Sequence, residues 1–359
     1  MKTRNGIFIL LLSLTLVFAS QAMAAEGLAA DPGDVALLTG LRTDTDESTC
    51  GVIAVRVGPI FLHRQDNDSQ GLLYDVGTGA KILDATDLNL GFAVGYDLTV
   101  EAQLGAFGGE VRYLGVPKWY EDKDAATPAV ICLPYVTPIF AFGAENVPAS
   151  YESELRSLEL NLKWYPTARL AVLAGPRYIG LDEELIMDLD FGGGLAAESS
   201  TETVNALFGG QVGVEGVFFT VGGFSADGWL KAGYYLNNMS TDAAITMGGG
   251  LIFHSDSKTD RGAFVGDLGI NLNYAITPNI LLTAGYQLLW IEKAALAPEQ
   301  ITEHDVVSGV GRTVDDSVLY QGIRAGIIVT FDICGKPKPA PAPEPAPVIE
   351  PKLEPMTKN

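Results

Sequence analysis

The sequence predicts an all-β protein, a transmembrane antiparallel up-and-down β-barrel of about ten strands, with twelve as the alternative. Three observations predict it. Apolar and polar residues alternate from Cys50 to Phe331, in segments of roughly 10 to 16 residues, which suits strands that cross a membrane at a tilt. Short and long connections follow one another in turn. The last segment ends on an aromatic residue, Phe331, as the terminal strand of an outer-membrane barrel does.

Composition excludes several other classes. The chain has 359 residues, of which 47% are hydrophobic and 19% charged, with 41 glycines and a formal net charge of -21. It is too apolar for a disordered chain and too acidic to bind nucleic acid through a basic patch. Beyond the N-terminus no apolar run approaches the roughly 20 residues of a membrane-spanning helix.

The N-terminus has the pattern of an export signal. Lys2 and Arg4 precede an apolar stretch over residues 7–19, and Ala22 and Ala24 provide the small residues that a signal peptidase requires. We therefore expect residues 1–24 to be a cleaved signal peptide and the protein to reside in a bacterial outer membrane. An uncleaved anchor helix is the alternative.

Four regions follow from this interpretation: the signal peptide, a polar N-terminal segment (25–49), the barrel (50–332) and a Pro-rich tail (333–359). The clearest strand alternates Leu158, Leu160, Leu162 and Trp164 with polar residues. An even strand number leaves both ends in the periplasm. The predicted strands are 52–64, 87–97, 98–112, 152–165, 168–181, 203–216, 228–238, 262–276, 279–294 and 317–331.

The predicted connections set the topology. Short turns are expected near Asp97-Leu98, at Pro166-Thr167 and at residues 277–279, and a medium one between Thr220 and Asp227. An extra hairpin within 129–142 would make twelve strands. A soluble β-sandwich also alternates, but its strands are shorter. Long polar loops, external in an outer-membrane barrel, are expected at 65–86, 113–150, 182–202, 239–261 and 295–316.

Several strands resemble a known family. RSLELNLKWYPTARLAVLAGPRYIGLDEEL (156–185), VNALFGGQVG (204–213), GWLKAGYYLNN (228–238), GYQLLWIEKAALAPEQI (285–301) and VLYQGIRAGIIVTF (318–331) are similar to the β-barrel porin family seven of planctomycetes and some related bacteria. The resemblance covers residues 50–331. It implies an outer-membrane β-barrel with pore activity and brings no catalytic residues. The Pro-rich tail departs from barrels that stop at the terminal aromatic residue.

Strand parity identifies the side chains that face the lumen. Acidic and basic residues nearly balance there, which favours ion pairs across a narrow barrel over a strongly selective channel. A ten-stranded barrel encloses little space. Besides Asp87, Asp97 and Arg169, the charged residues expected in the lumen are Glu101, Glu159, Lys163, Arg177, Glu215, Lys231, Asp267 and Arg324.

Most of the negative charge lies in the five long loops, which hold 23 acidic and 6 basic residues. Clustered carboxylates attract cations, so one loop could hold Ca²⁺ or Mg²⁺ that bridges to anionic lipid headgroups. A solvated acidic face is the alternative, and no other cofactor is expected. The candidate loop residues are Asp182, Glu183, Glu184, Asp188 and Asp190, with no basic residue beside them in the sequence.

The chain has three cysteines and a proline-rich C-terminal tail. Cys50, Cys132 and Cys334 allow one disulfide, and barrel closure would bring Cys50 and Cys334 together; unpaired thiols are the alternative. The alternating prolines after Cys334 favour an extended periplasmic spacer, either passive or reaching peptidoglycan. Other expected partners are outer-membrane lipid, lipopolysaccharide and the barrel-assembly machinery, with no nucleic acid.

Three functions are compatible with this sequence. The first, which the family resemblance favours, is a porin with acidic external loops that lets small solutes or ions pass. Its alternative is a closed structural or adhesive barrel whose loops bind cations or surface partners. The third is a hydrolase at the barrel rim, for which His254 with Asp256 is the one plausible pair. Because the common hydrolase and nucleotide-binding motifs are missing from the sequence, we expect no enzyme activity.

Overall fold

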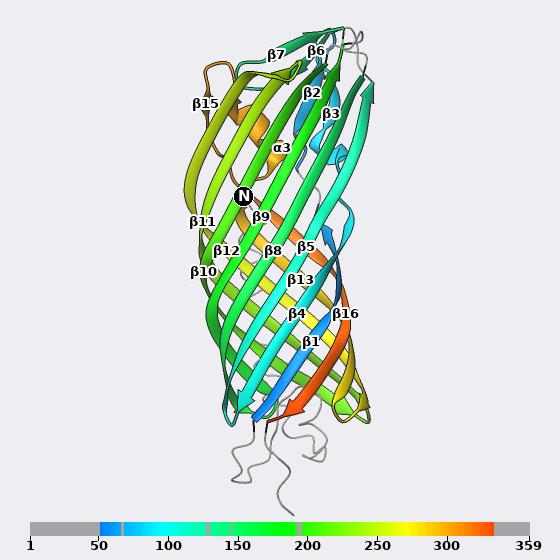
Figure 1. Ribbon diagram of the computed structural model, residues 1–359, viewed down its shortest axis with the longest axis vertical. Coiled ribbons are helices and arrows are strands. Elements are labelled where there is room, and N and C mark those ends of the chain that lie inside the picture. Colours follow the sequence, from blue (N-terminus) through cyan, green and yellow to red (C-terminus); the bar gives the residue numbers. More distant parts are fainter. Residues whose placement is uncertain (1–50, 66–67, 127–129, 144–145, 192–195, 334–359) are drawn as a thin grey trace, which may run out of the picture.

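Ten long antiparallel strands surround a common axis in the computed structural model, which describes residues 51–65, 68–126, 130–143, 146–191 and 196–333 (Figure 1). All ten cross the axis obliquely. They are β1 (Gly51–Arg64), β4 (Phe92–Leu104), β5 (Phe107–Ala126), β8 (Asn146–Thr167), β9 (Leu170–Asp190), β10 (Ala196–Val221), β11 (Phe224–Met247), β12 (Gly250–Thr277), β13 (Ile280–Ala294) and β16 (Asp316–Asp332).

The sheet closes on itself. β1 pairs with β16, with Val52 opposite Asp332 and Val57 opposite Ile327, and β11 pairs with β12 to complete the ring. Every long strand therefore has two antiparallel neighbours, so no long strand is left with an open edge. The predicted fold class, an all-β up-and-down barrel of ten strands, is confirmed.

Alternation along each strand separates two environments. On β8, Leu158, Leu160, Leu162 and Trp164 point outward and are about half exposed or more, whereas Lys163 and its odd-numbered neighbours are buried inside. Outward apolar residues on all ten strands form one belt, which we call the membrane band. A band of this kind around a polar interior is the arrangement of a barrel that spans a membrane.

One end of the barrel, which we call the turn end, carries two-residue turns. The predicted turn at Asp97-Leu98 is wrong, because β4 runs unbroken through these residues and turns at Gly105 and Ala106. Gly105 has φ +59, a left-handed conformation that tight hairpins require and that favours glycine. Gly222, with φ +59, likewise makes a tight turn where a medium connection between Thr220 and Asp227 was predicted.

At the opposite end, the cap end, strands continue where long loops were predicted. Half of 113–150 and most of 182–202 and 239–261 belong to β5 and to β8 through β12, and β11 turns into β12 at Gly248 and Gly249. These segments read as loops because their outward residues are polar. Their alternation nevertheless persists, since Leu189 stays buried between the outward Asp188 and Asp190.

A second, smaller sheet covers the cap end (Figure 1). Its order is β3-β2-β6-β7, so the hairpin expected within 129–142 exists but joins this sheet. The twelve-strand alternative is therefore wrong, because strands of four residues are far shorter than the roughly 9–11 needed to cross a membrane. The strands are β2 (Gly71–Asp75), β3 (Lys81–Asp84), β6 (Val130–Leu133) and β7 (Ile139–Phe142).

The connection between β13 and β16 completes the cap. It contains α3 (Ala297–Gln300), η3 (Ile301–Glu303), β14 (His304–Asp305) and β15 (Val310–Gly311), and a further turn, η2 (Ala85–Asp87), follows β3. Among the described residues, no helix is long and apolar enough to cross a bilayer. His304 fixes this connection to the barrel, because its ring nitrogens lie 2.9 Å from Thr241 Oγ1 and 3.0 Å from Ser255 Oγ.

The apolar core lies inside the barrel toward the cap end. Trp119, Tyr151 and Leu289 from the barrel wall pack in one cluster with Leu72 and Ile131 from the small sheet, and each is at most 1% exposed. The cap thus fills this half of the lumen with side chains.

Several predictions lie outside the described residues. These are the signal peptide (1–24), the polar segment (25–49), the tail from residue 334 and the pairing of Cys50 with Cys334. Cys132, on β6, is a half-buried free thiol.

Candidate functional site

A layer of charged side chains crosses the lumen at the level of the membrane band. Arg112 on β5 is at its centre. Its guanidinium lies 2.9 Å from Asp97 on β4, 3.6 Å from Glu159 on β8 and 3.7 Å from Asp267 on β12, and it donates a 2.7 Å hydrogen bond to Gln287 on β13. In the strand order β12 is diametrically opposite β5. These contacts therefore span the full width of the barrel.

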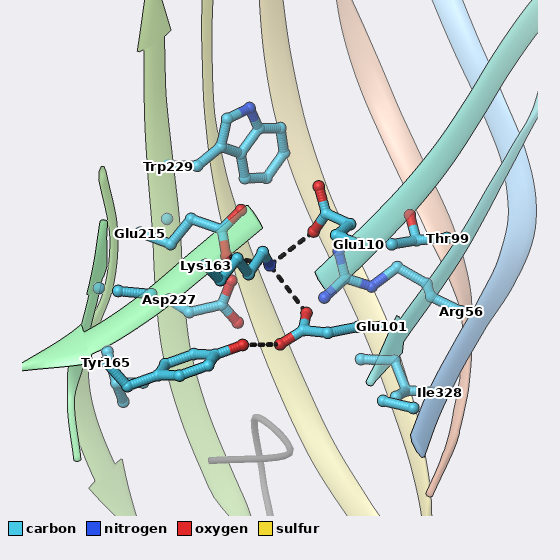
Figure 2. A pocket seen from close by; sticks show the side chains of 15 residues that line it. Arg56, Thr99, Glu101, Glu110, Lys163, Tyr165, Glu215, Asp227, Trp229 and Ile328 are labelled. Atoms are coloured by element: carbon cyan, nitrogen blue, oxygen red, sulfur yellow. Dashed lines mark hydrogen bonds and ion pairs between the residues drawn. The ribbon is translucent and has the colours of Figure 1, made fainter. Parts of the chain in front are cut away.

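Two lysines extend the layer, and Figure 2 shows the first of them, Lys163, among its carboxylate partners. Lys163 Nζ lies 2.8 Å from Glu101, 2.6 Å from Glu110 and 2.7 Å from Glu215. The oxygens of these three carboxylates lie within 4.8 Å of one another, a spacing that suits a metal ion. Here the Lys163 ammonium supplies the positive charge. Lys231 on β11 lies 2.9 Å from Glu159 and 3.4 Å from Glu110 across the lumen.

Two further arginines complete the layer. Arg177 lies 3.1 Å from Asp267, and Arg324 lies 2.9 Å from Asp97. The Trp229 ring is contacted by the guanidinium groups of Arg112 and Arg324, at 5.4 and 4.9 Å from its centroid, and its indole N–H donates to Asp267. Such cation–π contacts are stronger when the groups are removed from water.

All eight candidate lumen residues belong to this layer. The layer comprises Asp97, Glu101, Glu110, Arg112, Glu159, Lys163, Arg177, Glu215, Lys231, Asp267 and Arg324, six acidic and five basic residues. Asp87 and Arg169 do not. Asp87 is exposed in η2, and Arg169 lies in the turn between β8 and β9.

Glu110 and Arg112 are the layer residues that sequence reasoning missed. The misplaced turn explains this, because a strand running through 98–112 points even-numbered residues outward. The turn at Gly105 and Ala106 reverses parity, so even-numbered residues of β5 point inward. The residue that indicates the true position of this turn is Gly105, which is followed two residues later by the outward Phe107.

Burial makes the layer an obstruction. The side chains of Lys163, Arg177, Glu159 and Asp267 are 1% exposed. Buried charges are tolerated when they are paired, and removal of one partner leaves a costly isolated charge. On the turn side of the layer a cavity of about 70 Å³ remains, lined in part by Arg56, Tyr165, Asp227 and Trp229 (Figure 2).

A second buried pair fixes the cap inside the barrel. Arg64 at the end of β1 lies 2.7 Å from Glu183 on β9, and both side chains are at most 1% exposed. Glu183 also accepts a 2.7 Å hydrogen bond from Tyr151 and a 3.0 Å hydrogen bond from the backbone N–H of Ala297. One carboxylate thus joins two strands of the wall to the segment that begins α3.

The prediction that residues 182–190 form a loop is wrong. Residues 182–190 belong to β9, because buried and exposed side chains keep alternating along this strand after it has passed the membrane band. Glu183 points inward, and Asp182, Glu184, Asp188 and Asp190 point outward. Basic residues also lie nearby in space, since Arg156 forms an ion pair with Asp182 and Arg64 pairs with Glu183.

A different acidic feature emerges on the outer wall above the membrane band. Five carboxylates lie in register on five neighbouring strands, and we call them the acidic row. Lys118 pairs with Glu152 at one end of the row, and near the other end His254 Nε2 lies 2.8 Å from Asp242. The row is Glu152, Glu184, Glu202, Asp242 and Asp256.

The middle of the row is electrostatically strained. Partial burial, together with Glu202, Glu152 and Glu198, raises the pKa of Glu184. Like charges directly opposite one another on adjacent strands destabilise a sheet. The hydrogen bond to Asp242 raises the pKa of His254, and the partner that contacts its ring is Asp242 rather than the Asp256 considered for catalysis.

Glu202→Lys should stabilise the barrel, by about 0.5–1 kcal/mol at low salt, because it replaces a repulsive neighbour of both Glu184 and Asp242 with an attractive one. Urea unfolding in lipid vesicles measures the change, which high salt should reduce. Asp260→Lys is the matched control, since it alters net charge equally but lies opposite Asn238. Equal stabilisation by both variants would contradict the explanation.

Attachment of the cap should depend on pH through Glu299. Burial and the adjacent Asp316 raise the pKa of Glu299 to about 8. A carboxyl group whose pKa is raised in the folded state stabilises that state at low pH, and the contribution is lost as pH rises to about 8. Hydrogen exchange of residues 295–303 should therefore be about a hundredfold faster at pH 9 than at pH 6 after correction for intrinsic rates. Glu299→Gln should remove this difference; an unchanged difference would refute the assignment.

Comparison with known proteins gives one family. The model of the family described as Putative beta barrel porin-7 matches residues 16–308. No curated protein matches the sequence. Among solved structures, the outer membrane protease OmpT from Escherichia coli is 11% identical, with a TM-score of 0.47, over 81% of this chain and 100% of that one. The translocator domain of autotransporter NalP from Neisseria meningitidis is 12% identical, with a TM-score of 0.34, over 88% and 98%.

Proposed function

This chain belongs to the Putative beta barrel porin-7 family. We propose that it is an outer-membrane barrel whose lumen is closed and whose external part is its working surface. The observation that carries the proposal is the set of contacts that Arg112 makes across the lumen, to Asp267 and Gln287 on the opposite wall. In this proposal the turn end faces the periplasm and the cap end faces outward, as in outer-membrane barrels.

Two barriers in series support closure. The charged layer occupies the lumen at the membrane band, and the apolar core, which includes Trp119 and Leu289, fills it toward the cap end. Breaking one buried ion pair costs about 3–5 kcal/mol, and opening a path through the layer requires several to part together. A solute would also have to displace the cap, which Glu183 holds to the wall.

The external wall is the surface left for interaction. Strands β5 and β8 through β12 extend beyond the membrane band and carry the acidic row. Clustered carboxylates attract cations, which in turn bridge to the anionic headgroups of lipopolysaccharide. The function proposed is therefore structural or adhesive, without a catalytic step. Export through residues 1–24 and insertion by the barrel-assembly machinery belong to the same proposal.

Passive passage of small solutes or ions is the second candidate. The family's description as a porin favours it, as does the cavity between the charged layer and the turn end. This function requires the layer and the cap to rearrange together. The acidic row near the outer mouth would then give the pore a mild preference for cations.

Liposome swelling distinguishes the two candidates. Vesicles that contain the folded protein, verified by heat-modifiable gel migration, are diluted into an isotonic solution of a small sugar. A closed barrel predicts no swelling beyond that of protein-free vesicles. Rapid swelling that falls with the size of the sugar would reject closure and support the porin. Vesicles with an established general porin serve as the positive control.

A further inference from the structure

Two asparagines on β12 face the lumen near the turn end. Asn271 and Asn273 are each 1% exposed. Both side-chain amides donate to one carboxylate on the neighbouring strand, since the Nδ2 atoms of Asn271 and Asn273 lie 2.7 and 2.5 Å from the two oxygens of Asp227. This arrangement fixes the amide orientation, because a reversed amide would place its oxygen against the carboxylate.

The two amide oxygens therefore point away from β11, toward β13. The residue opposite Asn273 on β13 is Thr283, whose side chain is 5% exposed, and the residue opposite Asn271 is Gly285. A Cβ atom on Gly285 would lie 2.3 Å from Asn271 Oδ1. Glycine at this position thus leaves the space in which the amide oxygen lies.

Three buried oxygens in this place lack a hydrogen-bond partner within the described part of the chain: Asn271 Oδ1, Asn273 Oδ1 and Thr283 Oγ1. An unsatisfied buried polar group costs about 1–3 kcal/mol. Native proteins rarely leave such groups side by side, and a bound water or ion is the usual explanation. Asn273 lies directly opposite Thr283, and Asn271 lies two residues from Asn273 on the same face of β12, so the three oxygens line one part of the lumen wall.

The chemistry of the site favours a cation. Its ligands are neutral oxygens, and the hydrogen bonds to Asp227 increase the negative charge on both amide oxygens. The adjoining cavity, which Asp227 also lines, has four carboxylates, including Glu101 and Glu215, against the two cations Arg56 and Lys163. Hard cations such as Ca²⁺ take amide, hydroxyl and water oxygens together, and a small ligand charge gives weak binding, with Kd of about 10⁻⁴–10⁻³ M.

We propose that Asn271, Asn273 and Thr283, with Asp227 behind the amides, form a Ca²⁺ site at the turn end of the lumen. Water molecules from the cavity complete the coordination. The site stabilises the end of the barrel at which β11, β12 and β13 turn, and it is separate from the acidic row on the outer wall. It does not depend on whether the lumen conducts.

Terbium luminescence tests the site in the folded, full mature barrel in detergent micelles. Trp229, two residues from Asp227 on β11, is the expected sensitiser. We expect a Tb³⁺ component that Ca²⁺ displaces and that Asn271→Leu/Asn273→Leu abolishes. Glu184→Gln/Glu202→Gln, which removes carboxylates from the outer wall alone, should retain it. The result that overturns the proposal is a Ca²⁺-sensitive signal that is equal in the double-leucine variant and the wild type, because the oxygens would then hold water only.

A second variant tests the site if the double-leucine protein does not fold. Asn273→Asp adds a carboxylate to the proposed ligands and places it beside Asp227, so the bound cation relieves the repulsion between the two charges and Ca²⁺ binding should tighten about tenfold. It should also make the thermal stability of the barrel depend on Ca²⁺ more steeply than in the wild type. Unchanged affinity and unchanged Ca²⁺ dependence in Asn273→Asp would refute the site.

Discussion

Arg112→Met should destabilise the barrel by about 3–5 kcal/mol, the largest effect expected of any single substitution in the lumen. Methionine matches the length of the side chain but leaves Asp97, Glu159 and Asp267 buried beside one another without the cation they share. It also removes the charge from the face of Trp229. Urea unfolding in lipid vesicles, followed by tryptophan fluorescence, measures the change.

Arg312→Met is the matched control, because the Arg312 side chain is 77% exposed on the cap and lies 4.0 Å from Glu303. Its expected effect is within about 0.5 kcal/mol of zero. A double-mutant cycle of Arg112→Met with Asp267→Asn should show a coupling of about 0.5–3 kcal/mol, since the two residues meet across the lumen. Additive effects would show that the opposite walls do not interact at this point.

Glu183→Gln should release the cap and destabilise the protein by about 3 kcal/mol, because the buried Arg64 would lose the negative charge that lies 2.7 Å from its guanidinium. The same carboxylate accepts hydrogen bonds from Tyr151 and Ala297, so the start of α3 should lose its attachment to the wall. Faster hydrogen exchange across residues 295–303, together with a lower unfolding midpoint, measures both consequences.

The neighbouring residue provides the control. Glu184→Gln removes the same charge from the same strand, but Glu184 points outward into the acidic row. Its loss relieves repulsion, so stability should stay constant or rise slightly. If Glu183→Gln and Glu184→Gln had equal effects, the inward pairing of Glu183 would be wrong.

Strand number and parity could be predicted from the sequence because they follow from local alternation. Leu158 to Trp164 identifies a membrane-spanning strand without reference to any other part of the chain. The same reasoning failed where polarity conflicted with alternation. Residues 182–190 are polar on their outward side because the strand there has left the membrane band, so a continuing strand resembled a loop.

The interior could be predicted only in part. Parity identified Lys163 and Asp267 as lumen residues, but their partners depend on barrel closure and on register between strands far apart in the sequence. Lys163 binds Glu101 and Glu215 at separations of 62 and 52 residues. One misplaced turn, at Asp97 in place of Gly105, was enough to turn Arg112 outward in the prediction. The central residue of the layer was therefore missed.

Closure of the lumen is the central claim, and single-channel recording in a planar lipid bilayer tests it most directly. The folded wild-type protein should give no stable conductance steps, whereas an established general porin in the same bilayer should give them as the positive control. The wild-type protein should be silent because its two barriers lie in series. Stable unitary steps from the wild-type protein at low voltage would contradict the account.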